Sequence, residues 1–348
     1  MVRVLGLDIG GANIKWATLA VEHGVFSWRT DATPVRAPLI ASDPGAVISI
    51  AVPEGPFDAV VLTQTACLAY PDLIEGTLRL FRSVRDTFRD TPVLLAVDVC
   101  GNLRDVAEVF DRPTDFVCTN IAATATVVGK RHPCCLLADM GTTSTDLIAI
   151  SDGRFRIILP AHARLAARQV VYSGTLRTPV QSVLQALPFN GGLVPVVNEQ
   201  VACTGDAYVV LGWLQLEDYS IAPWDLGPKT IEGCTQRLAK LLAANSGSFT
   251  SAQAKIIARY TAECQISEIT RAALQIASAA PEVLSFGVYA GLGRRLLAEL
   301  FRRLEVPCQA LEAALGLPEG LEYTPAVGQC LAWADENGLE TAQPRCGR

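Results

Sequence analysis

Two aspartates, Asp8 and Asp139, each stand at the end of an apolar run and just before a glycine turn. The first context reads LGLDIGGANIK and the second LLADMGTTSTDLIAI. Glycine permits close backbone approach, so the amides of such a turn can form a concave site for an anion. A neighbouring carboxylate repels phosphate unless a divalent cation lies between them, and Mg²⁺ binds one or two carboxylates together with phosphate oxygens. Two turns of this kind predict a cleft that holds a polyphosphate from both sides.

The same stretches supply the other candidates for phosphate and metal binding. The candidates for diphosphate or nucleotide binding around the two turns are Gly10, Gly11, Asn13, Gly141, Thr142, Thr143, Ser144 and Thr145, with amides expected from the glycines and Thr142 and hydroxyls from the three residues that follow. Lys15 either reaches phosphate or is a solvated strand lysine. Asp146 is expected as a further metal carboxylate or as a support for the other two. Asp98, after LLAVDV, either points into the cleft as a catalytic residue or caps a turn.

The order of apolar runs and turns predicts an α/β chain made of two similar units. The first unit should contain strands at 2–10, two within 13–30, and others at 57–65, 91–100 and 114–120, with helices at 103–110 and 121–130. The second should begin with a three-stranded meander over 133–161, whose last strand is 154–161, and continue with a helical region from about 237 to 280, a strand at 281–291 and a helix at 293–304. We expect lobes at 1–130 and 131–335, an insertion at about 175–235 and a tail at 336–348.

Composition narrows the class of protein. The 348 residues are 50% hydrophobic and 18% charged, with a net charge of −6, which is typical of a core-rich globular protein and argues against nucleic-acid binding. The first residues lack the pattern of a leader peptide, and no apolar run reaches the roughly 20 residues of a membrane span. We expect a cytoplasmic protein without membrane or nucleic-acid partners, able to form a homodimer.

Eleven cysteines form no CxxC pair, and most lie in apolar runs such as LLAVDVC and DFVCTN. This usage is typical of buried, reduced thiols. Cys134 and Cys135 are adjacent, and neighbouring strand residues point to opposite faces, so they make a poor metal chelate. Of the three histidines, His162 lies nearest a candidate strand, and a surface position is favoured over a role as a base.

LDIGGANIK and ADMGTTSTD resemble the two phosphate motifs of the actin, heat-shock chaperone and sugar-kinase superfamily, and FGVYAGLG (286–293) stands where that superfamily has its adenosine motif. The resemblance implies two ribonuclease-H-like lobes around a central cleft, with Gly291 and Gly293 near a nucleotide. Two departures stand out. Ala12 and Asn13 replace the usual hydroxyl residue of the first turn, and Ile121 occupies the position where a kinase needs a carboxylate base.

Further stretches are similar to one branch, the hydantoinase and oxoprolinase-like proteins linked to tetrahydromethanopterin-dependent C1 metabolism. They are LTQTACLAYPDLIEGT (62–77), VVYSGTLRTPV (170–180), VNEQVACTGDAYVVLGWL (197–214) and QRLAKLL (236–242). The resemblance implies a transferase of methanofuran biosynthesis. It would join the phenol oxygen of a tyramine or tyrosine derivative to an aminomethylfuran-methyl diphosphate and release diphosphate.

Under this hypothesis Asp8, Asp139 and Asp146 are the metal ligands, Mg²⁺ is the cofactor, and ATP binding stays open. Arg177 is expected either to bind a substrate carboxylate or to form a plain salt bridge, and Glu199 and Asp206 to orient the substrate. The main alternative is an ATP-dependent small-molecule kinase. A non-catalytic nucleotide-binding regulator and an ATP-driven hydantoinase are the remaining hypotheses.

Overall fold

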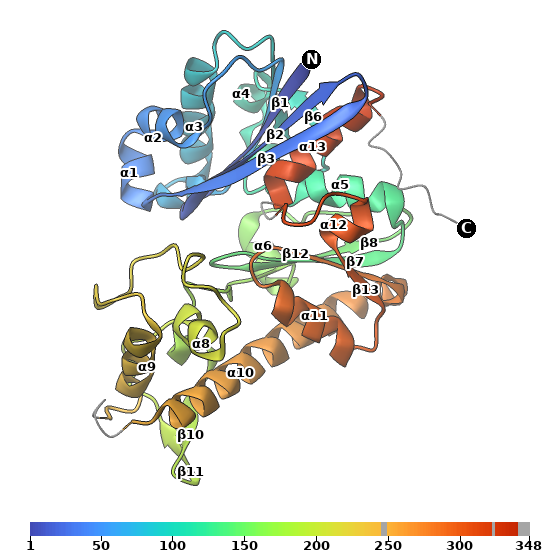
Figure 1. Ribbon diagram of the computed structural model, residues 1–348. Coiled ribbons are helices and arrows are strands. Elements are labelled where there is room, and N and C mark those ends of the chain that lie inside the picture. The colour runs from blue at the N-terminus through green and yellow to red at the C-terminus, as the bar shows by residue number, and fades with distance from the viewer. Residues whose placement is uncertain (245–248, 322–323, 340–348) are drawn as a thin grey trace.

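The computed structural model describes residues 1–244, 249–321 and 324–339, and it contains two main β-sheets with helices between them and on their outer faces (Figure 1). Within these residues the first sheet has the order β3-β2-β1-β4-β5-β6 and the second β13-β12-β7-β8-β9. The first sheet comprises β1 (Val2–Ile9), β2 (Asn13–Glu22), β3 (Val25–Pro34), β4 (Ala59–Gln64), β5 (Val93–Val97) and β6 (Leu103–Asp105). The second comprises β7 (Cys135–Met140), β8 (Thr145–Ile150), β9 (Val170–Val171), β12 (Gly287–Ala290) and β13 (Cys308–Ala310).

The two sheets share one topology. In each, an antiparallel meander (β1–β3 and β7–β9) is extended on the other side by two parallel strands (β4, β5 and β12, β13). This repetition confirms the predicted α/β fold of two ribonuclease-H-like lobes. A small hairpin, β10 (Ala186–Phe189) with β11 (Gly192–Pro195), projects from the second lobe within the predicted insertion.

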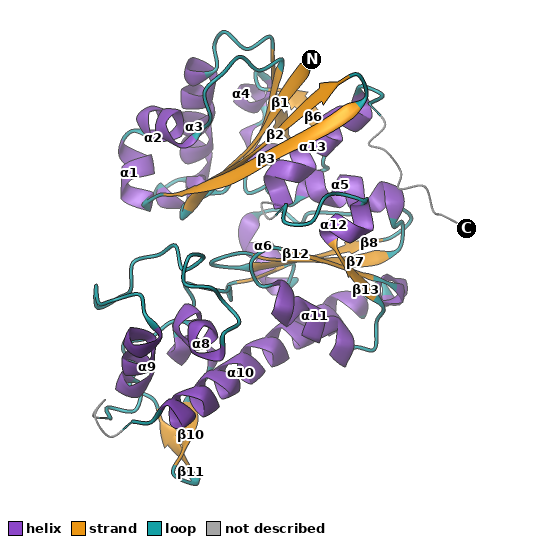
Figure 2. Cartoon of the chain, in the orientation of Figure 1, coloured by secondary structure: helices purple, strands orange, loops and turns teal. Residues whose placement is uncertain are grey.

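Helices complete the layers, as Figure 2 shows. The helices of the N-terminal part are α1 (Ala37–Ser42), α2 (Pro44–Ala51), α3 (Leu73–Thr87), α4 (Glu108–Asp111) and α5 (Ala122–Arg131), with 3₁₀ turns η1 (Ala66–Ala69) and η2 (Pro113–Phe116). The C-terminal part has α6 (Ala161–Ala166), α7 (Val180–Val183), α8 (Thr204–Leu211), α9 (Ile231–Lys240), α10 (Ser251–Ala277), η4 (Pro281–Ser285), α11 (Arg294–Arg303), α12 (Leu311–Leu315) and α13 (Thr324–Glu336). Within the described residues, no helix combines the length and apolar character that crossing a bilayer requires.

A shared core joins the two lobes. It packs α5 and α13 between the facing surfaces of the two sheets, while separate cores fill the outer faces. Although α13 is C-terminal, it lies on β1 and β2 (Figure 1). A Cβ on Gly6 would lie 2.0 Å from the Ala326 carbonyl oxygen, and one on Gly328 would lie 2.4 Å from Thr124 Oγ1. Glycine therefore sets the close approach of α13 to both β1 and α5.

Three predicted elements are wrong, and the strand predicted at 281–291 is right only for its second half, because η4 occupies the first half. Residues 103–110 form the short strand β6 and then α4 instead of one helix, and residues 114–120 form part of η2 and a turn instead of a strand. Cys118 in that turn has a positive φ of 54°, a conformation that a strand excludes.

The predicted strand at 154–161 is also wrong. The side chain of Gln169 accepts from the amide of Ile158 (3.0 Å) and donates to the carbonyl of Arg156 (2.7 Å), which replaces the ladder of a strand. The third strand of the second meander is instead β9, which pairs with β8.

Most thiols of the described residues follow the sequence-based expectation, whereas Cys134, Cys264 and Cys308 are only partly buried. The cysteines of the described residues are free, and Cys67, Cys118, Cys135, Cys203, Cys234 and Cys330 are buried. Cys100 is exposed, because β5 ends at Val97 and Cys100 lies in the following turn. Cys346 and most of the predicted tail lie outside the described residues. The lobe boundary near residue 130 stays a prediction; it falls at the end of α5.

Candidate functional site

Strand alternation places the charged residues of both hairpins on facing surfaces. Asp8 shares a strand face with Val4, and Asp139 shares one with Leu137, and both of these apolar residues belong to the core between the lobes. Because side chains two residues apart point the same way, both aspartates point toward the opposite lobe. The hairpin partners follow: Lys15 lies directly opposite Asp8, and Asp146 directly opposite Asp139.

The two glycine turns have the same backbone geometry. Gly10 donates its amide to the carbonyl of Asn13 at 3.0 Å, and Gly141 donates to the carbonyl of Ser144 at 2.9 Å. These two amides therefore close the turns and are not offered to a ligand, contrary to the prediction. Within the described residues no acceptor is found for the amides of Gly11, Ala12, Thr142, Thr143 and Ser144, which leaves them available as anion donors.

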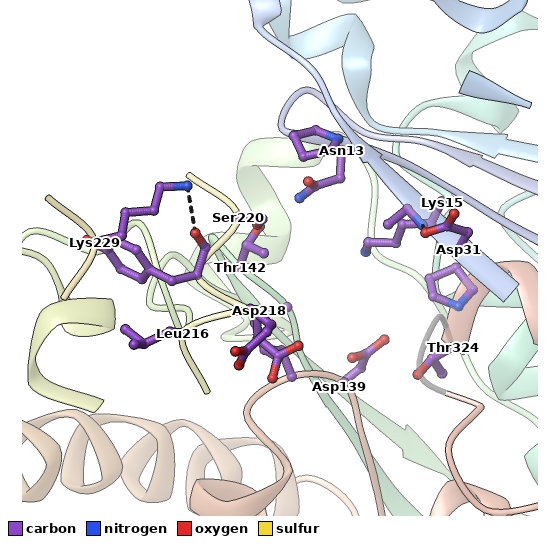
Figure 3. Close-up of a pocket in the computed structure, with 18 residues that line it drawn as sticks. Asn13, Lys15, Asp31, Asp139, Thr142, Leu216, Asp218, Ser220, Lys229 and Thr324 are labelled. Carbon is purple, nitrogen blue, oxygen red and sulfur yellow. Dashed lines mark hydrogen bonds between the residues drawn. The ribbon is translucent and has the colours of Figure 1, made fainter. Parts of the chain in front are cut away.

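Two cavities meet at these turns. An inner cavity of about 290 Å³ is lined by both turns and by η1, and an outer cavity of about 490 Å³ lies on the other side of the turns. The residues that line both are Asn13, Lys15, Asp139, Gly141 and Thr142. In Figure 3, Lys15 and Asp31 lie on one side of the outer cavity, Leu216 and Lys229 on the other, and Asp139 between them. The two cavities therefore share several residues of the predicted phosphate site.

Asp8, Asp139 and Asp146 form the floor of the cleft, and their three carboxylates differ in their partners. Asp8 lies 3.5 Å from Lys15 Nζ and accepts from Thr63 Oγ1 at 3.3 Å. Asp146 pairs with Arg164 Nη2 at 2.8 Å. Asp139 is 7% exposed, and the described residues provide neither a hydrogen bond nor an ion pair for its carboxylate.

Burial raises the pKa of all three carboxyls. For Asp8 the nearby Lys15 opposes this effect, and for Asp146 the guanidinium of Arg164 does. For Asp139 burial raises the pKa to about 7; Lys15 lowers it, and the charges of Asp146 and Asp8 raise it further. An unpaired buried carboxylate is costly, and Asp139 is the one of the three that has neither a hydrogen bond nor an ion pair within the described residues.

These carboxylates fit a cation only with help from a ligand. Among the described residues no three carboxylate, imidazole or thiol side chains lie close enough to enclose a metal ion by themselves. This arrangement suits Mg²⁺, which takes one or two protein carboxylates and completes its shell with phosphate oxygens and water. The unpaired Asp139 and the neighbouring turn amides are the groups that would hold such a complex.

The third glycine motif packs directly on this floor. Gly291 has a φ of +86°, and a Cβ there would lie 2.3 Å from Asp139 Oδ1. Gly291 lines the outer cavity. Gly293 does not line it: its amide donates to the Met140 carbonyl at 3.0 Å, and it begins α11.

Several predicted site residues lie away from the cavities. Thr145 is buried and donates its hydroxyl to the Ser173 carbonyl at 2.7 Å. Asp98 accepts from the amides of Cys100 and Asn102, both at 2.9 Å, and so closes a turn, the second of its two predicted roles. Glu199 is exposed and lines neither cavity.

Asp206 is a structural anchor of the second lobe. It is 1% exposed and pairs with the buried Arg237 at 2.8 Å, and it accepts from the hydroxyl of Tyr219 at 3.0 Å. Because Tyr219 lines the outer cavity, Asp206 shapes that cavity indirectly and does not face a ligand.

Several cleft residues escaped the sequence analysis. They are Asp31, Leu68, Arg164, Tyr172, Glu217 and Asp218. Arg164 lies two residues after the exposed His162 and donates to the Cys118 carbonyl at 3.0 Å, as well as pairing with Asp146. Nothing in the local sequence marks Arg164 as buried. Tyr172 lies in VVYSGTLRTPV, a stretch that the sequence analysis used for the family resemblance. An aromatic residue two positions before Gly174 was the one feature that could have marked it as a cleft residue.

Two sheets of one topology, with a glycine hairpin from each at the floor of the cleft between them, define the actin-like ATPase fold. The nucleotide-free structure of acetone carboxylase, an enzyme of ATP-dependent acetone carboxylation, shares this fold: its TM-score is 0.53, with 10% identity over 94% of this chain and 70% of that one. The chain belongs to the hydantoinase/oxoprolinase family, whose model matches residues 64–317.

Two relatives of this chain carry the same enzyme name, (4-{4-[2-(γ-L-glutamylamino)ethyl]phenoxymethyl}furan-2-yl)methanamine synthase. The protein of Methanocaldococcus jannaschii is 32% identical over 251 residues, 70% of this chain and 72% of its own length. The protein of Methanococcus vannielii is 33% identical over 111 residues, 32% of this chain and 50% of its own length.

Proposed function

We propose that this chain is a transferase of methanofuran-type cofactor biosynthesis. It joins a phenol oxygen to the methylene carbon of an aminomethylfuran-methyl diphosphate and releases diphosphate. The observation that carries the proposal is the pair of matched hairpins, which bring Asp8 and Asp139 to one cleft floor beside unused turn amides. The names of the two relatives support it, because their product contains a phenoxymethyl ether on a furan that bears a methanamine.

The reaction balances without ATP. The phenol oxygen forms a bond to the methylene carbon, and the bond between that carbon and the diphosphate oxygen breaks with its electron pair leaving on diphosphate. The phenol proton passes to the departing diphosphate. An electron-rich furan stabilises positive charge on the methylene carbon, so the protein has no need of a strong nucleophile of its own.

The chain's residues act on the leaving group. The free amides of Gly11, Thr142 and Thr143 donate to phosphate oxygens, and the charge of Lys15, which lines both cavities, offsets the developing negative charge. Mg²⁺, held by Asp8 and Asp139, would neutralise the diphosphate further. Because the donors are fixed before the reaction, they stabilise the charge without reorganisation.

The outer cavity suits the aminomethyl group of the donor. Asp31, Glu217 and Asp218 line it, and a primary ammonium is the complementary charge. The amine of Lys229 in the same wall is engaged, because it donates to the Tyr219 carbonyl at 2.9 Å.

The kinase alternative finds no carboxylate at the position where the resemblance places its base. Ile121, at the position where a kinase needs a carboxylate, is fully buried in the core between the lobes. Asn120, which lines the inner cavity, cannot accept a proton as a base.

The test is an incubation of the purified protein with Mg²⁺, the furan diphosphate and γ-glutamyltyramine, followed by mass spectrometry of the ether and by measurement of released diphosphate. A parallel reaction contains ATP and simple alcohols or sugars. We expect ether and diphosphate in equal amounts, their loss on chelation of Mg²⁺, and a loss of about 100-fold or more in Asp8→Asn. Asp90→Asn, at a side chain that is 94% exposed, is the control. Formation of ADP without ether would overturn the proposal in favour of a kinase.

A further inference from the structure

Arg177 lines the inner cavity with an unpaired guanidinium. The described residues offer it neither an ion pair nor a side-chain hydrogen bond, whereas the buried arginines Arg164 and Arg237 are both paired with aspartates. Partial burial lowers the pKa of Arg177, which reflects the cost of holding this charge without an anion. An arginine in this state is suited to a carboxylate or phosphate of a ligand.

The backbone around Arg177 is held rigidly beside the second turn. The amides of Leu176 and Arg177 both donate to the Thr142 carbonyl, at 3.0 and 2.9 Å. Thr178 Oγ1 accepts from the amide of Gly174 at 2.7 Å. The base of the side chain is therefore positioned before any ligand arrives, and its guanidinium is close to the predicted phosphate site without belonging to the turn.

The same cavity exposes two large apolar side chains from opposite lobes. Leu68 of η1, in the first lobe, is 51% exposed, and Tyr172, in the second, is 55% exposed. Ala37, Ala69 and Val170 add to the apolar lining. Exposed apolar surface from both lobes at one cavity indicates a binding surface, and a planar aromatic ring fits it because such rings gain from stacking and from burial.

We propose that the inner cavity is the subsite for the phenolic acceptor, with the aromatic ring against Leu68 and Tyr172 and a carboxylate tail on Arg177. This inference rests on the proposed function and adds the place where the acceptor binds and the residues that select its ring and its anionic group. Arg177, which lines the inner cavity and not the outer one, is what assigns the carboxylate tail to the inner cavity.

The test compares two acceptors that differ only in charge, γ-glutamyltyramine and its α-carboxamide. Binding of each to the ligand-free protein is measured by calorimetry, and kcat and KM are measured with the furan diphosphate. We expect Arg177→Gln to weaken binding of γ-glutamyltyramine and to raise its KM by about 10- to 100-fold, as for loss of a charged hydrogen bond. The carboxamide should change by less than about threefold. Arg302→Gln, at a side chain that is 73% exposed on α11, is the control.

The contact between the aromatic ring of the acceptor and Tyr172 is tested separately. Tyr172→Ala should weaken both acceptors by a similar factor of about 5 to 10, and Tyr172→Phe, which keeps the ring, should lose less. An equal loss of both acceptors in Arg177→Gln, or no loss of either, would overturn the assignment of the carboxylate. If the wild type binds γ-glutamyltyramine but forms no ether, the proposed reaction fails while the subsite stands. If it forms ether with both acceptors equally well, the subsite fails while the reaction stands.

Discussion

Replacing Asp139 by asparagine should make the ligand-free protein more stable at alkaline pH. The wild-type carboxylate is 7% exposed, has no hydrogen-bond or ion-pair partner among the described residues, and lies directly opposite Asp146. Asparagine keeps the shape and removes the charge. The change also relieves the repulsion that Asp139 exerts on Asp8 and Asp146.

The magnitude follows from the pKa. The folded protein raises the pKa of Asp139 from 3.8 to about 7, so between these values the folded state binds more protons than the unfolded chain. The free energy of unfolding therefore falls as pH rises through this window. At about 1.4 kcal/mol per unit of pKa shift, the ionised Asp139 lowers the free energy of unfolding by on the order of 4 kcal/mol at pH 8. At pH 5 the effect is less than half of that.

The measurement is urea unfolding of wild type and Asp139→Asn at pH 5 and pH 8, with linear extrapolation to water. We expect the variant to gain stability at both pH values and to gain more at pH 8. Asp90→Asn should differ from wild type by less than about 0.5 kcal/mol at either pH. Mg²⁺ with diphosphate should raise the melting temperature of the wild type and leave that of Asp139→Asn unchanged.

A gain that is the same at both pH values, or a variant less stable than wild type at pH 8, would refute the reasoning. Either result would mean that Asp139 is already compensated in the ligand-free protein. The carboxylate would then not be held ready for a cation, and its place in the proposed site would have to be given up.

Two further substitutions test the geometry. Gly291→Ala should abolish most of the activity, because its Cβ would lie 2.3 Å from Asp139 Oδ1. Gly24→Ala is the control: Gly24 has a similar φ of +78° and open space around it, so this variant should have a lower melting temperature but keep its activity. Equal activity in the two variants would contradict the role of the close packing at Gly291. Asp206→Ala should cost about 1–3 kcal/mol in chemical unfolding, because the guanidinium of Arg237 loses its buried partner and keeps the ion pair with the less buried Asp225, at 3.3 Å. A loss below about 1 kcal/mol would show that Asp225 alone compensates Arg237.

The hairpins were predictable because their information is local. Asp8 and Lys15, like Asp139 and Asp146, are paired across one turn, and strand alternation alone determines that each pair shares a face. The repetition also predicted a meander at the start of each unit, which is right for the first unit and, in the second, for its first two strands. Where local signals were weak, the prediction was wrong: the side chain of Gln169, distant from 156–158 in sequence, replaced a strand ladder there.

The sequence by itself determined the two aspartate hairpins and their glycine turns, because each depends on residues within one hairpin; the two-lobed fold was implied by the resemblance of these hairpins to a known superfamily. Only the tertiary structure decided that Arg164 compensates Asp146 while Asp139 has no partner among the described residues. It also brought Leu68 and Tyr172, about a hundred residues apart along the chain, to one cavity with Arg177. The physical reason is that burial and charge pairing depend on which surfaces the chain folds together, and spacing within one segment does not encode the partner supplied by another.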